Sequence, residues 1–199
     1  MKNVFLLLIL TYCANIDASD YSERQEVKDF VKELAVGESL DQKELLSIFS
    51  QAEYKQSIID AISRPAERVL DWSQYQDIFL TKRRIVGGLK FLRENQNALR
   101  SAKEDYGVPA EIISSIIGVE TMYGQITGGY RVLDSLVTLS FDYPPRSSFF
   151  RSELRHLILL TKEEDQIITE LTGSYAGAMG LGQFIPSSYR AYAIDFDGD

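Results

Sequence analysis

The sequence predicts an all-α protein, mainly helical, and two observations lead to that class. Apolar residues recur at helical spacing along almost the whole chain after Ser19, as they do in helices that bury one face. Typical boundary residues separate these segments: Asp41 and Thr81 suit N-caps, and Gly107 suits a helix end. We find no convincing β-hairpin, repeat or low-complexity linker in the sequence.

The expected helices follow one another with short connections. The first helix ends at Gly37, the second is capped by Asp41 with Glu44 in a capping box, and the third stops before Pro65. A long helix from Thr81 to Tyr106 follows, and then two helices, from Pro109 to Gly124 and from about 131 to 139. The last helix is capped by Ser147 or Ser148. Before the last helix, the segment 141–145 ends in two prolines and is expected to form a stiff turn.

Composition and charge narrow the class of protein. The chain has 199 residues, of which 45% are hydrophobic and 25% charged, which suits a globular protein with one good core. The net charge of −8 argues against electrostatic binding of nucleic acid. The short basic triplet at residues 82–84 opens a helix, and we interpret it as a solvated helix face.

Residues 1–18 have the layout of a secretory signal peptide. A positive start is followed by an apolar run at residues 4–10, too short to stay in a membrane as a helix, and then by small and polar residues. We therefore expect export, with a mature domain over residues 20–199. Cys13, the only cysteine, is either discarded by cleavage near Ala18, which we favour, or lipidated as an anchor. Neither alternative leaves a cysteine pair for a disulfide.

Glu120 is an acid where the predicted helix should be apolar. The apolar stripe of that helix consists of Ile112, Ile113, Ile116 and Ile117. Glu120 takes the next place on the stripe, where burial would favour the protonated carboxyl that a general acid needs. On spacing alone, a solvated or ion-paired glutamate is the alternative. Gly118 and Gly124 nearby would let a ligand approach closely.

A second informative stretch covers residues 173–189. It combines glycines and alanines, which allow close backbone approach, with polar Ser174 and Gln183, which suit sugar hydroxyls and amides. Its aromatic residues, which could stack on sugar faces, are Tyr175, Phe184 and Tyr189. The alternative is a close helix–helix crossing lined by small residues.

Four blocks of the chain carry a family resemblance. They lie at residues 106–109, 116–121, 133–136 with 138–141, and 176–180 with 182–184. Together they resemble the lytic murein transglycosylase B family of bacterial cell-wall enzymes, over about Trp72 to Asp199. The resemblance implies a lysozyme-like, mostly helical fold with the catalytic glutamate at a helix end in a cleft. It also implies cleavage between N-acetylmuramic acid and N-acetylglucosamine in peptidoglycan, leaving a 1,6-anhydromuramoyl end.

Carried over by position, the resemblance assigns roles to individual residues. Glu120 matches the catalytic acid, and Tyr75, Arg146, Ser174 and Gln183 match groove residues that contact the glycan. The implied partners are peptidoglycan glycan strands in the periplasm and no nucleic acid, with a lipid anchor to the outer membrane if Cys13 is modified. No cofactor is required by the chemistry that it implies.

One carboxyl suffices for that reaction. Glu120 would protonate the leaving oxygen and then, as a carboxylate, accept the proton of the muramoyl C6 hydroxyl, an internal nucleophile of high effective molarity. A lysozyme-type hydrolase needs a second carboxylate. Asp134 and Asp142 are the candidates, although we expect structural capping roles for both. A hydrolytic muramidase and a catalytically inactive glycan-binding remnant are therefore the two alternative functions.

The chain departs from the family pattern at three places. Tyr123 stands where the family often has tryptophan, and Pro145 where many members have a second arginine. Asp195, Asp197 and Asp199 resemble the first half of the family's EF-hand-like calcium loop. The remaining ligands of that loop do not follow, so we expect a domain that is incomplete at its C-terminus and a structural calcium only if the loop were complete.

Overall fold

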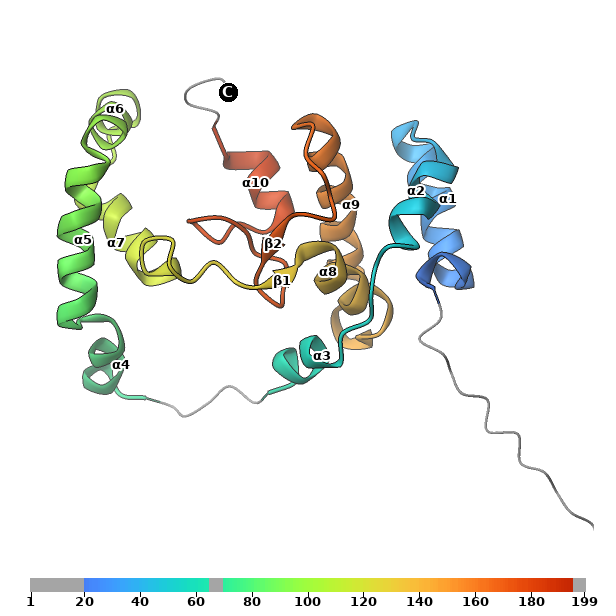
Figure 1. The fold of residues 1–199 in the computed structure, drawn as a ribbon, viewed down its shortest axis with the longest axis horizontal. Helices are drawn as coiled ribbons and strands as arrows, with labels where there is room; N and C mark the ends of the chain where they lie inside the picture. The colour runs from blue at the N-terminus through green and yellow to red at the C-terminus, as the bar shows by residue number, and fades with distance from the viewer. Residues whose placement is uncertain (1–19, 65–69, 195–199) are drawn as a thin grey trace, which may run out of the picture.

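The computed structural model describes residues 20–64 and 70–194, and every structural statement below concerns those residues. The chain forms ten α-helices there, two short 3-10 helices and two short strands (Figure 1). The elements are η1 (Tyr21–Glu23), α1 (Gln25–Glu38), α2 (Gln42–Phe49), α3 (Gln56–Ile62), α4 (Trp72–Phe79), α5 (Lys82–Glu94), α6 (Gln96–Tyr106), α7 (Ala110–Thr121), β1 (Tyr130–Arg131), α8 (Val132–Phe141), η2 (Pro144–Arg146), α9 (Ser147–Glu163), β2 (Thr172–Gly173) and α10 (Pro186–Tyr192). The prediction of a mainly helical fold is confirmed.

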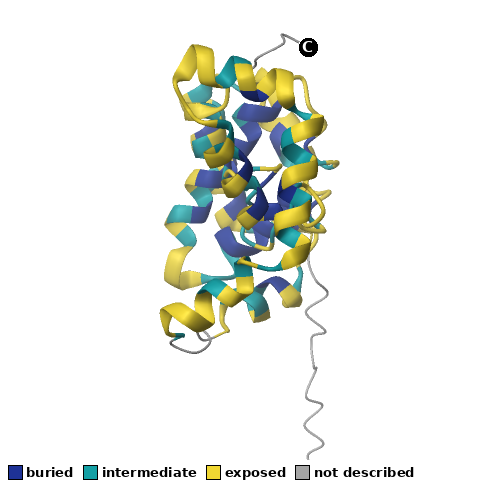
Figure 2. Ribbon diagram, turned by 90° about the vertical axis from the view of Figure 1, so that its left-hand side faces the viewer, coloured by how far each residue is buried: buried dark blue, intermediate teal, exposed yellow. Residues whose placement is uncertain are grey.

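The hydrophobic core is built around α8. Every residue of α8 from Val132 to Ser140 is buried, so this helix is covered on all sides, unlike an amphipathic surface helix. It packs against α9 and α3, and the aromatic rings of Phe30, Phe49 and Phe141 meet edge to face beside it. Figure 2 shows the buried residues gathered between the outer helices.

Helices α4 to α7 form a second group, on the left of Figure 1, that contributes little to this core. Helices α5 and α6 both pack against α7, yet Leu99 is their only buried large apolar residue among those described. Many apolar side chains of this group stay exposed: Trp72, Ile78, Leu80, Ile85, Val86, Leu89, Ile112, Ile116 and Val119. The group is therefore held by close backbone approach more than by apolar burial.

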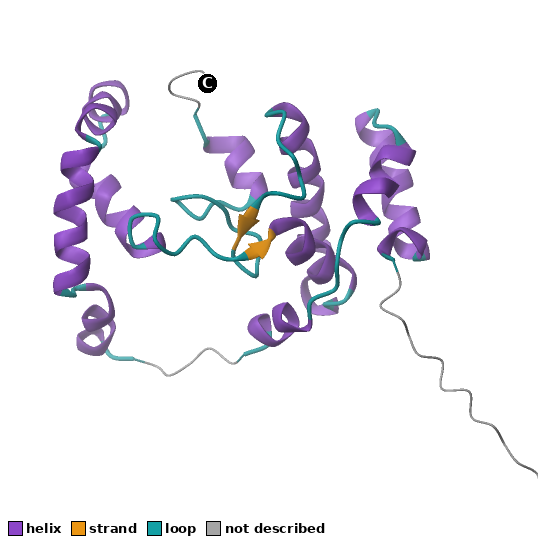
Figure 3. Ribbon diagram, in the orientation of Figure 1, coloured by secondary structure: helices purple, strands orange, loops and turns teal. Residues whose placement is uncertain are grey.

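A small sheet, which the sequence did not predict, joins the two groups' loops. Strand β1 pairs antiparallel with β2, with Tyr130 opposite Gly173 and Arg131 opposite Thr172 (Figure 3). Isolated bridges continue the pairing from Gly173 to Met179 and from Met179 to Phe184. Strands of two residues are too short to give a period-two sequence pattern, which explains why none was visible.

Several predicted helix boundaries were wrong, among them the end of α7, which is Thr121 and not Gly124, and the N-cap of α9, which is Arg146 and not Ser147 or Ser148. Helix α1 continues through Gly37 to Glu38, and Ser39 takes the left-handed conformation at its end with φ 56°. The long helix from Thr81 to Tyr106 is two helices, because Asn95 breaks it: its side-chain amide donates to Phe91 O at 2.9 Å and competes with the helical pattern. The N-caps at Asp41 and Thr81 and the C-terminal Gly107 are confirmed.

Helices α9 and α10 are tied by a buried acid. Glu153 is 3% exposed, and its Oε2 accepts the backbone N–H of Ser187 at 2.9 Å, in the first turn of α10. A carboxylate there satisfies one of the free N–H groups of a helix start. Among the described residues, no helix combines the length and the apolar character that crossing a membrane requires.

Leu136→Ala tests the role of α8 as the centre of the core. Leu136 is fully buried, so its truncation should lower the free energy of unfolding by about 2–5 kcal/mol, measured by urea denaturation. The matched control is Ile112→Ala, because Ile112 is 51% exposed, and it should change that free energy by no more than about 0.5 kcal/mol. Equal losses in the two variants would contradict the assignment of the core.

Candidate functional site

Glu120 lies in the last turn of α7, and it is exposed. Its carboxylate has no hydrogen bond or ion pair with any residue of 20–64 or 70–194. The prediction that it continues a buried stripe is wrong, since Ile112 and Ile116 are 51% and 53% exposed. Glu120 therefore presents a carboxyl at the end of a helix, where a ligand can reach it.

Helix α7 buries its small residues instead. The buried positions are Ser114, Gly118 and Thr121, which share one face. Ser114 and Gly118 face α5: a Cβ at Gly88 of α5 would be 3.8 Å from Ser114 Oγ, and a Cβ at Gly88 or at Gly118 would come within 2.7 Å or less of the Tyr123 hydroxyl oxygen. Ile112 and Ile116 stay exposed while the small residues are buried, so close backbone approach decides which face of α7 is buried.

Tyr123 fills the space at that crossing. Its ring also lies against Gly87, its hydroxyl donates to Arg84 O at 2.9 Å, and its centroid is 5.6 Å from that of Phe91. Tyr123 has φ 61°, between Met122 at 51° and Gly124 at 83°. Three successive left-handed residues turn the chain sharply after Glu120, a conformation that side chains other than glycine adopt rarely.

Arg84 connects three helices, which the sequence did not reveal. Its Nε donates to Gly118 O at 2.8 Å and its Nη1 to Ile78 O at 2.7 Å, while its guanidinium lies 5.1 Å from the Phe79 ring centroid. The prediction of a solvated basic face at residues 82–84 is therefore wrong for Arg84. A basic triplet gives no sign of which member turns inward, so no sequence signal was available.

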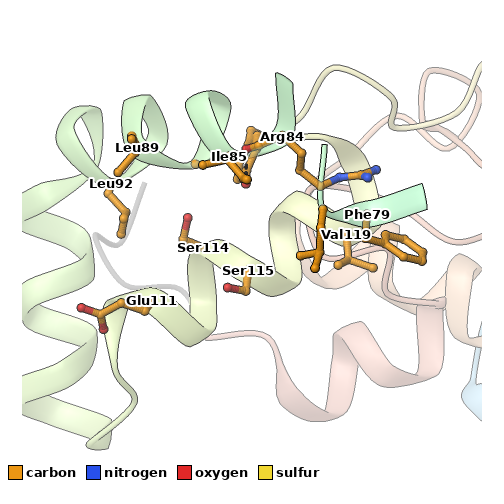
Figure 4. A pocket seen from close by; sticks show the side chains of 12 residues that line it. Phe79, Arg84, Ile85, Leu89, Leu92, Glu111, Ser114, Ser115 and Val119 are labelled. Atoms are coloured by element: carbon orange, nitrogen blue, oxygen red, sulfur yellow. Dashed lines mark hydrogen bonds between the residues drawn. The ribbon is translucent and has the colours of Figure 1, made fainter. Parts of the chain in front are cut away.

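A groove lies between α5 and α7, with a volume of about 270 Å³ (Figure 4). Ile85, Leu89 and Leu92 line it from α5, and Ser114, Ser115 and Val119 from α7. Its lining is mostly apolar, and Glu120 is not part of it although Val119 is. The groove thus lies on the α5 side of α7, beside the candidate acid.

Ser174 and Gln183 lie in the loops next to the small sheet. Ser174 Oγ accepts the N–H groups of Ala176 and Ala178, at 3.3 and 3.0 Å. Gln183 Nε2 donates to Thr127 O and Gly180 O, both at 3.1 Å. Both predicted groove residues therefore help to build the loops, and Gln183 ties its loop to the one that follows Glu120.

Tyr75 and Arg146 lie on other elements. Tyr75, 48% exposed, belongs to α4, where its ring contacts those of Trp72 and Phe79 at centroid distances of 6.1 and 5.1 Å. Arg146 ends η2, and its guanidinium lies 4.3 Å from the Phe149 ring centroid. Contacts among the described residues join the Gln183 loop to the segment that follows Glu120 and to the Ser174 loop, and they join neither Tyr75 nor Arg146 to these loops.

Asp134 is fixed by structural contacts. It is 2% exposed and accepts bonds from Arg131 at 2.6 and 2.8 Å and from the Glu53 N–H at 2.9 Å. The hydrogen bond to Asp134 raises the pKa of the Arg131 guanidinium above its ordinary value. Asp134 thus has a structural role, as expected, but it forms an ion pair with Arg131 and does not cap a helix.

Asp142 is held in the same manner at the other end of α8. Arg24 Nη1 donates to its two oxygens at 2.8 and 3.0 Å, and the Tyr21 hydroxyl donates to it at 2.5 Å. Burial, and next the hydrogen bond to Asp142, raise the pKa of the Tyr21 hydroxyl. Asp142 thus anchors the N-terminal segment to α8 and is not free as Glu120 is.

Several predictions fall on residues outside the described ranges. These are the signal peptide at 1–18 with Cys13, and the partial calcium loop of Asp195, Asp197 and Asp199. Within residues 20–64 and 70–194, histidine, cysteine and acidic side chains form no cluster of three that could hold a metal. The calcium and lipidation predictions stay predictions.

The sequence and fold are similar to those of known proteins. Residues 22–199 match the model of the transglycosylase SLT domain. The chain is 38% identical over 189 residues to membrane-bound lytic murein transglycosylase B of Escherichia coli (strain K12), covering 90% of this chain and 52% of that protein.

Solved structures of lytic transglycosylases are also similar to this chain in sequence and in fold. The soluble lytic transglycosylase SltB1 from Pseudomonas aeruginosa matches with TM-score 0.86 and 55% identity over 87% of this chain and 59% of that one. SltB3 from the same organism, solved with NAG-NAM-pentapeptide, matches with TM-score 0.76 and 27% identity over 87% of this chain and 46% of that one. The chain thus spans about half the length of these relatives.

The match to the family model covers nearly the whole chain, and the E. coli relative extends over most of it. The mostly helical, lysozyme-like fold agrees with that of the solved lytic transglycosylases. The chain belongs to the transglycosylase SLT domain family.

Proposed function

We propose that the chain is a lytic transglycosylase domain that cleaves the β-1,4 bond between N-acetylmuramic acid and N-acetylglucosamine in peptidoglycan and forms 1,6-anhydromuramoyl ends. One observation carries the proposal. Glu120 is an exposed, unpaired carboxyl among the described residues, at a helix end beside polar loops, whereas Asp134 and Asp142 are held in ion pairs. One free acid suits this reaction, and a hydrolase of the two-carboxylate type would need a second.

Glu120 acts twice in the proposed mechanism. As a general acid it gives its proton to the glycosidic oxygen, and the bond from that oxygen to C1 of the muramoyl residue breaks. As a carboxylate it then takes the proton of the C6 hydroxyl while O6 bonds to C1. The nucleophile belongs to the same sugar, so its effective molarity is high and no water has to be activated.

The exposure of Glu120 is compatible with this role. A general acid must hold its proton when it meets the substrate, and the Glu120 side chain is exposed in the free protein. A glycan strand lying across the end of α7 would itself exclude water from the carboxyl. The environment that the acid needs would then form in the complex.

Ser174 and Gln183 are proposed to contact the glycan with the hydrogen-bonding groups that the loops leave unused. Ser174 Oγ accepts both of its hydrogen bonds with described residues, which leaves its hydrogen to donate. Gln183 uses its amide nitrogen, so its Oε1 remains to accept, since no described residue donates to it. Tyr75 and Arg146 are proposed as more distant contacts, and exposed Tyr175 and Phe184 as stacking platforms.

The relatives support a cell-wall substrate and an envelope location. SltB3 was solved with NAG-NAM-pentapeptide, and the E. coli relative is a membrane-bound murein transglycosylase. We propose peptidoglycan strands as the partner and no nucleic acid, with the protein exported to the periplasm. Whether Cys13 anchors it to the outer membrane or is removed with residues 1–18 is decided by mass spectrometry of the mature N-terminus.

A glycan-binding remnant is the second candidate, because an apolar surface is exposed on α5 and α7, including Ile85, Leu89 and Ile116. Exposed apolar patches often mark binding surfaces. Binding of purified peptidoglycan by the wild-type chain without release of any product would favour this candidate.

Glu120→Gln tests the proposed acid. The amide cannot transfer the proton, so release of anhydro-muropeptides from purified peptidoglycan, followed by mass spectrometry, should fall by about 10²–10⁴-fold. Glu111→Gln is the matched control, because Glu111 is an exposed glutamate in the first turn of the same helix, and it should keep wild-type activity. Full activity of the Glu120 variant would exclude the mechanism.

Asp134→Asn and Asp142→Asn separate a transglycosylase from a hydrolytic muramidase. Both variants should be less stable, because each leaves an arginine without its carboxylate. Below their melting temperatures both should still release anhydro ends. Reducing ends from the wild type, together with their loss in either variant, would instead identify a hydrolase with that aspartate as the second carboxylate.

A further inference from the structure

Thr121, next to Glu120, is fully buried although it carries a hydroxyl. Its Oγ1 has three neighbours at hydrogen-bonding distance: Ile117 O at 3.2 Å, Leu181 O at 3.1 Å and the Gly124 N–H at 3.0 Å. A hydroxyl has one hydrogen to donate and can accept as well. The two carbonyls therefore compete for that hydrogen, while Gly124 donates to the oxygen.

The competition favours Leu181. Ile117 O already accepts the backbone N–H groups of Met122 and Tyr123 at the end of α7. Leu181 O receives no backbone N–H from the described residues. The hydrogen bond to Leu181 thus satisfies a carbonyl that has no other donor in this part of the chain, and it joins segments 60 residues apart.

Further contacts join the same two segments. Gln183 Nε2 donates to Thr127 O at 3.1 Å, and the Leu181 side chain lies against Gly124, where a Cβ would be 2.8 Å from its Cδ2. The loop that contains Leu181 is closed by Met179 and Phe184, whose backbones exchange bonds of 2.8 and 3.0 Å. Both segments are therefore well defined where they meet.

The bond from Gly124 fixes the turn on the other side. Met122, Tyr123 and Gly124 are all left-handed, and such residues persist only where their surroundings hold them. Thr121 Oγ1 accepts the Gly124 N–H and closes this turn. One hydroxyl thus sets both the path of the chain after Glu120 and the distance from the helix end to the 180–183 loop.

We infer that Thr121 is a positioning residue for Glu120. Its hydroxyl holds the end of α7 against the 180–183 loop, so that the carboxyl stays in register with the glycan-contacting residues through both proton transfers. This inference rests on the proposed transglycosylase function. The same carboxyl must serve as acid and then as base, and a displacement of about 1 Å can lower the rate by roughly 100-fold.

Thr121→Val and Thr121→Ser form the test, because valine keeps the shape of threonine without its hydroxyl and serine keeps the hydroxyl. With soluble glycan-strand fragments as substrate, the valine variant should lose roughly 10- to 100-fold in kcat with little change in KM. The serine variant should recover most of the wild-type kcat. Equal kcat for wild type and the valine variant would overturn the inference.

Thr138→Val controls for a general loss of stability. Thr138 is also fully buried, and its Oγ1 accepts the Lys55 N–H at 3.3 Å, in the core around α8. It should lower the melting temperature and leave kcat unchanged. If kcat falls as much in this variant as in Thr121→Val at matched stability, the effect at Thr121 is structural and the inference fails.

Two further outcomes are distinguishable. If circular dichroism shows that Thr121→Val is unfolded, Thr121→Cys replaces it. A thiol is a weak hydrogen-bond donor, so this variant should also have a lower kcat. A wild-type kcat in Thr121→Cys would overturn the inference. If the wild-type chain releases no anhydro product, the proposed function fails. Comparing the wild type with Glu120→Gln therefore tests the function separately from the role of Thr121.

Discussion

The complete burial of α8 is the constraint on which the rest of the fold depends. A helix with no solvent-facing side needs neighbours on every side, and α9, α3 and the N-terminal helices provide them. Arginine–aspartate pairs mark both ends of α8: Arg131 with Asp134, and Arg24 with Asp142. Because these pairs also bind the backbone or side chains of residues 21–53, they fix how the N-terminal segment wraps the core.

That constraint explains what the two aspartates do. Viewed as isolated acids in a sequence, Asp134 and Asp142 are candidates for catalysis, because carboxylates near a predicted groove are chemically suitable. In the structure each is bound by an arginine and by another donor. Removing either carboxylate would leave an arginine without its partner. The stability of the core therefore depends on Asp134 and Asp142, whereas the proposed chemistry depends on Glu120.

The helices could be predicted because their signals are local. The caps at Asp41 and Thr81 and the end at Gly107 lie within one turn of the helices that they bound. The break at Asn95 and the continuation of α1 through Gly37 depend on single competing hydrogen bonds and turn geometry, which sequence spacing does not reveal. The two-residue strands are defined only by their pairing with residues 41 and 43 positions away in the chain.

The candidate site was predictable in its residues and not in its geometry. The sequence pattern placed Glu120 on a buried stripe, but α7 leaves Ile112 and Ile116 of that stripe exposed, because the small residues Ser114 and Gly118 let α5 approach. The sequence pattern records which residues are apolar and not which neighbour comes closest. The same limit hid Arg84 and Thr121, whose roles come from contacts with residues 34 and 60 positions away.

The Tyr123 ring also couples the side-chain sizes that fit at positions 87, 88, 118 and 123. It occupies the space that a Cβ at Gly87, Gly88 or Gly118 would need, while its hydroxyl is held by Arg84 O. A larger residue at any of the three glycines is therefore acceptable only with a smaller one at 123, and a smaller side chain at 123 leaves a void that only those glycine positions can fill. In an alignment of relatives, these four positions should vary as a set, with the volume of the set kept nearly constant.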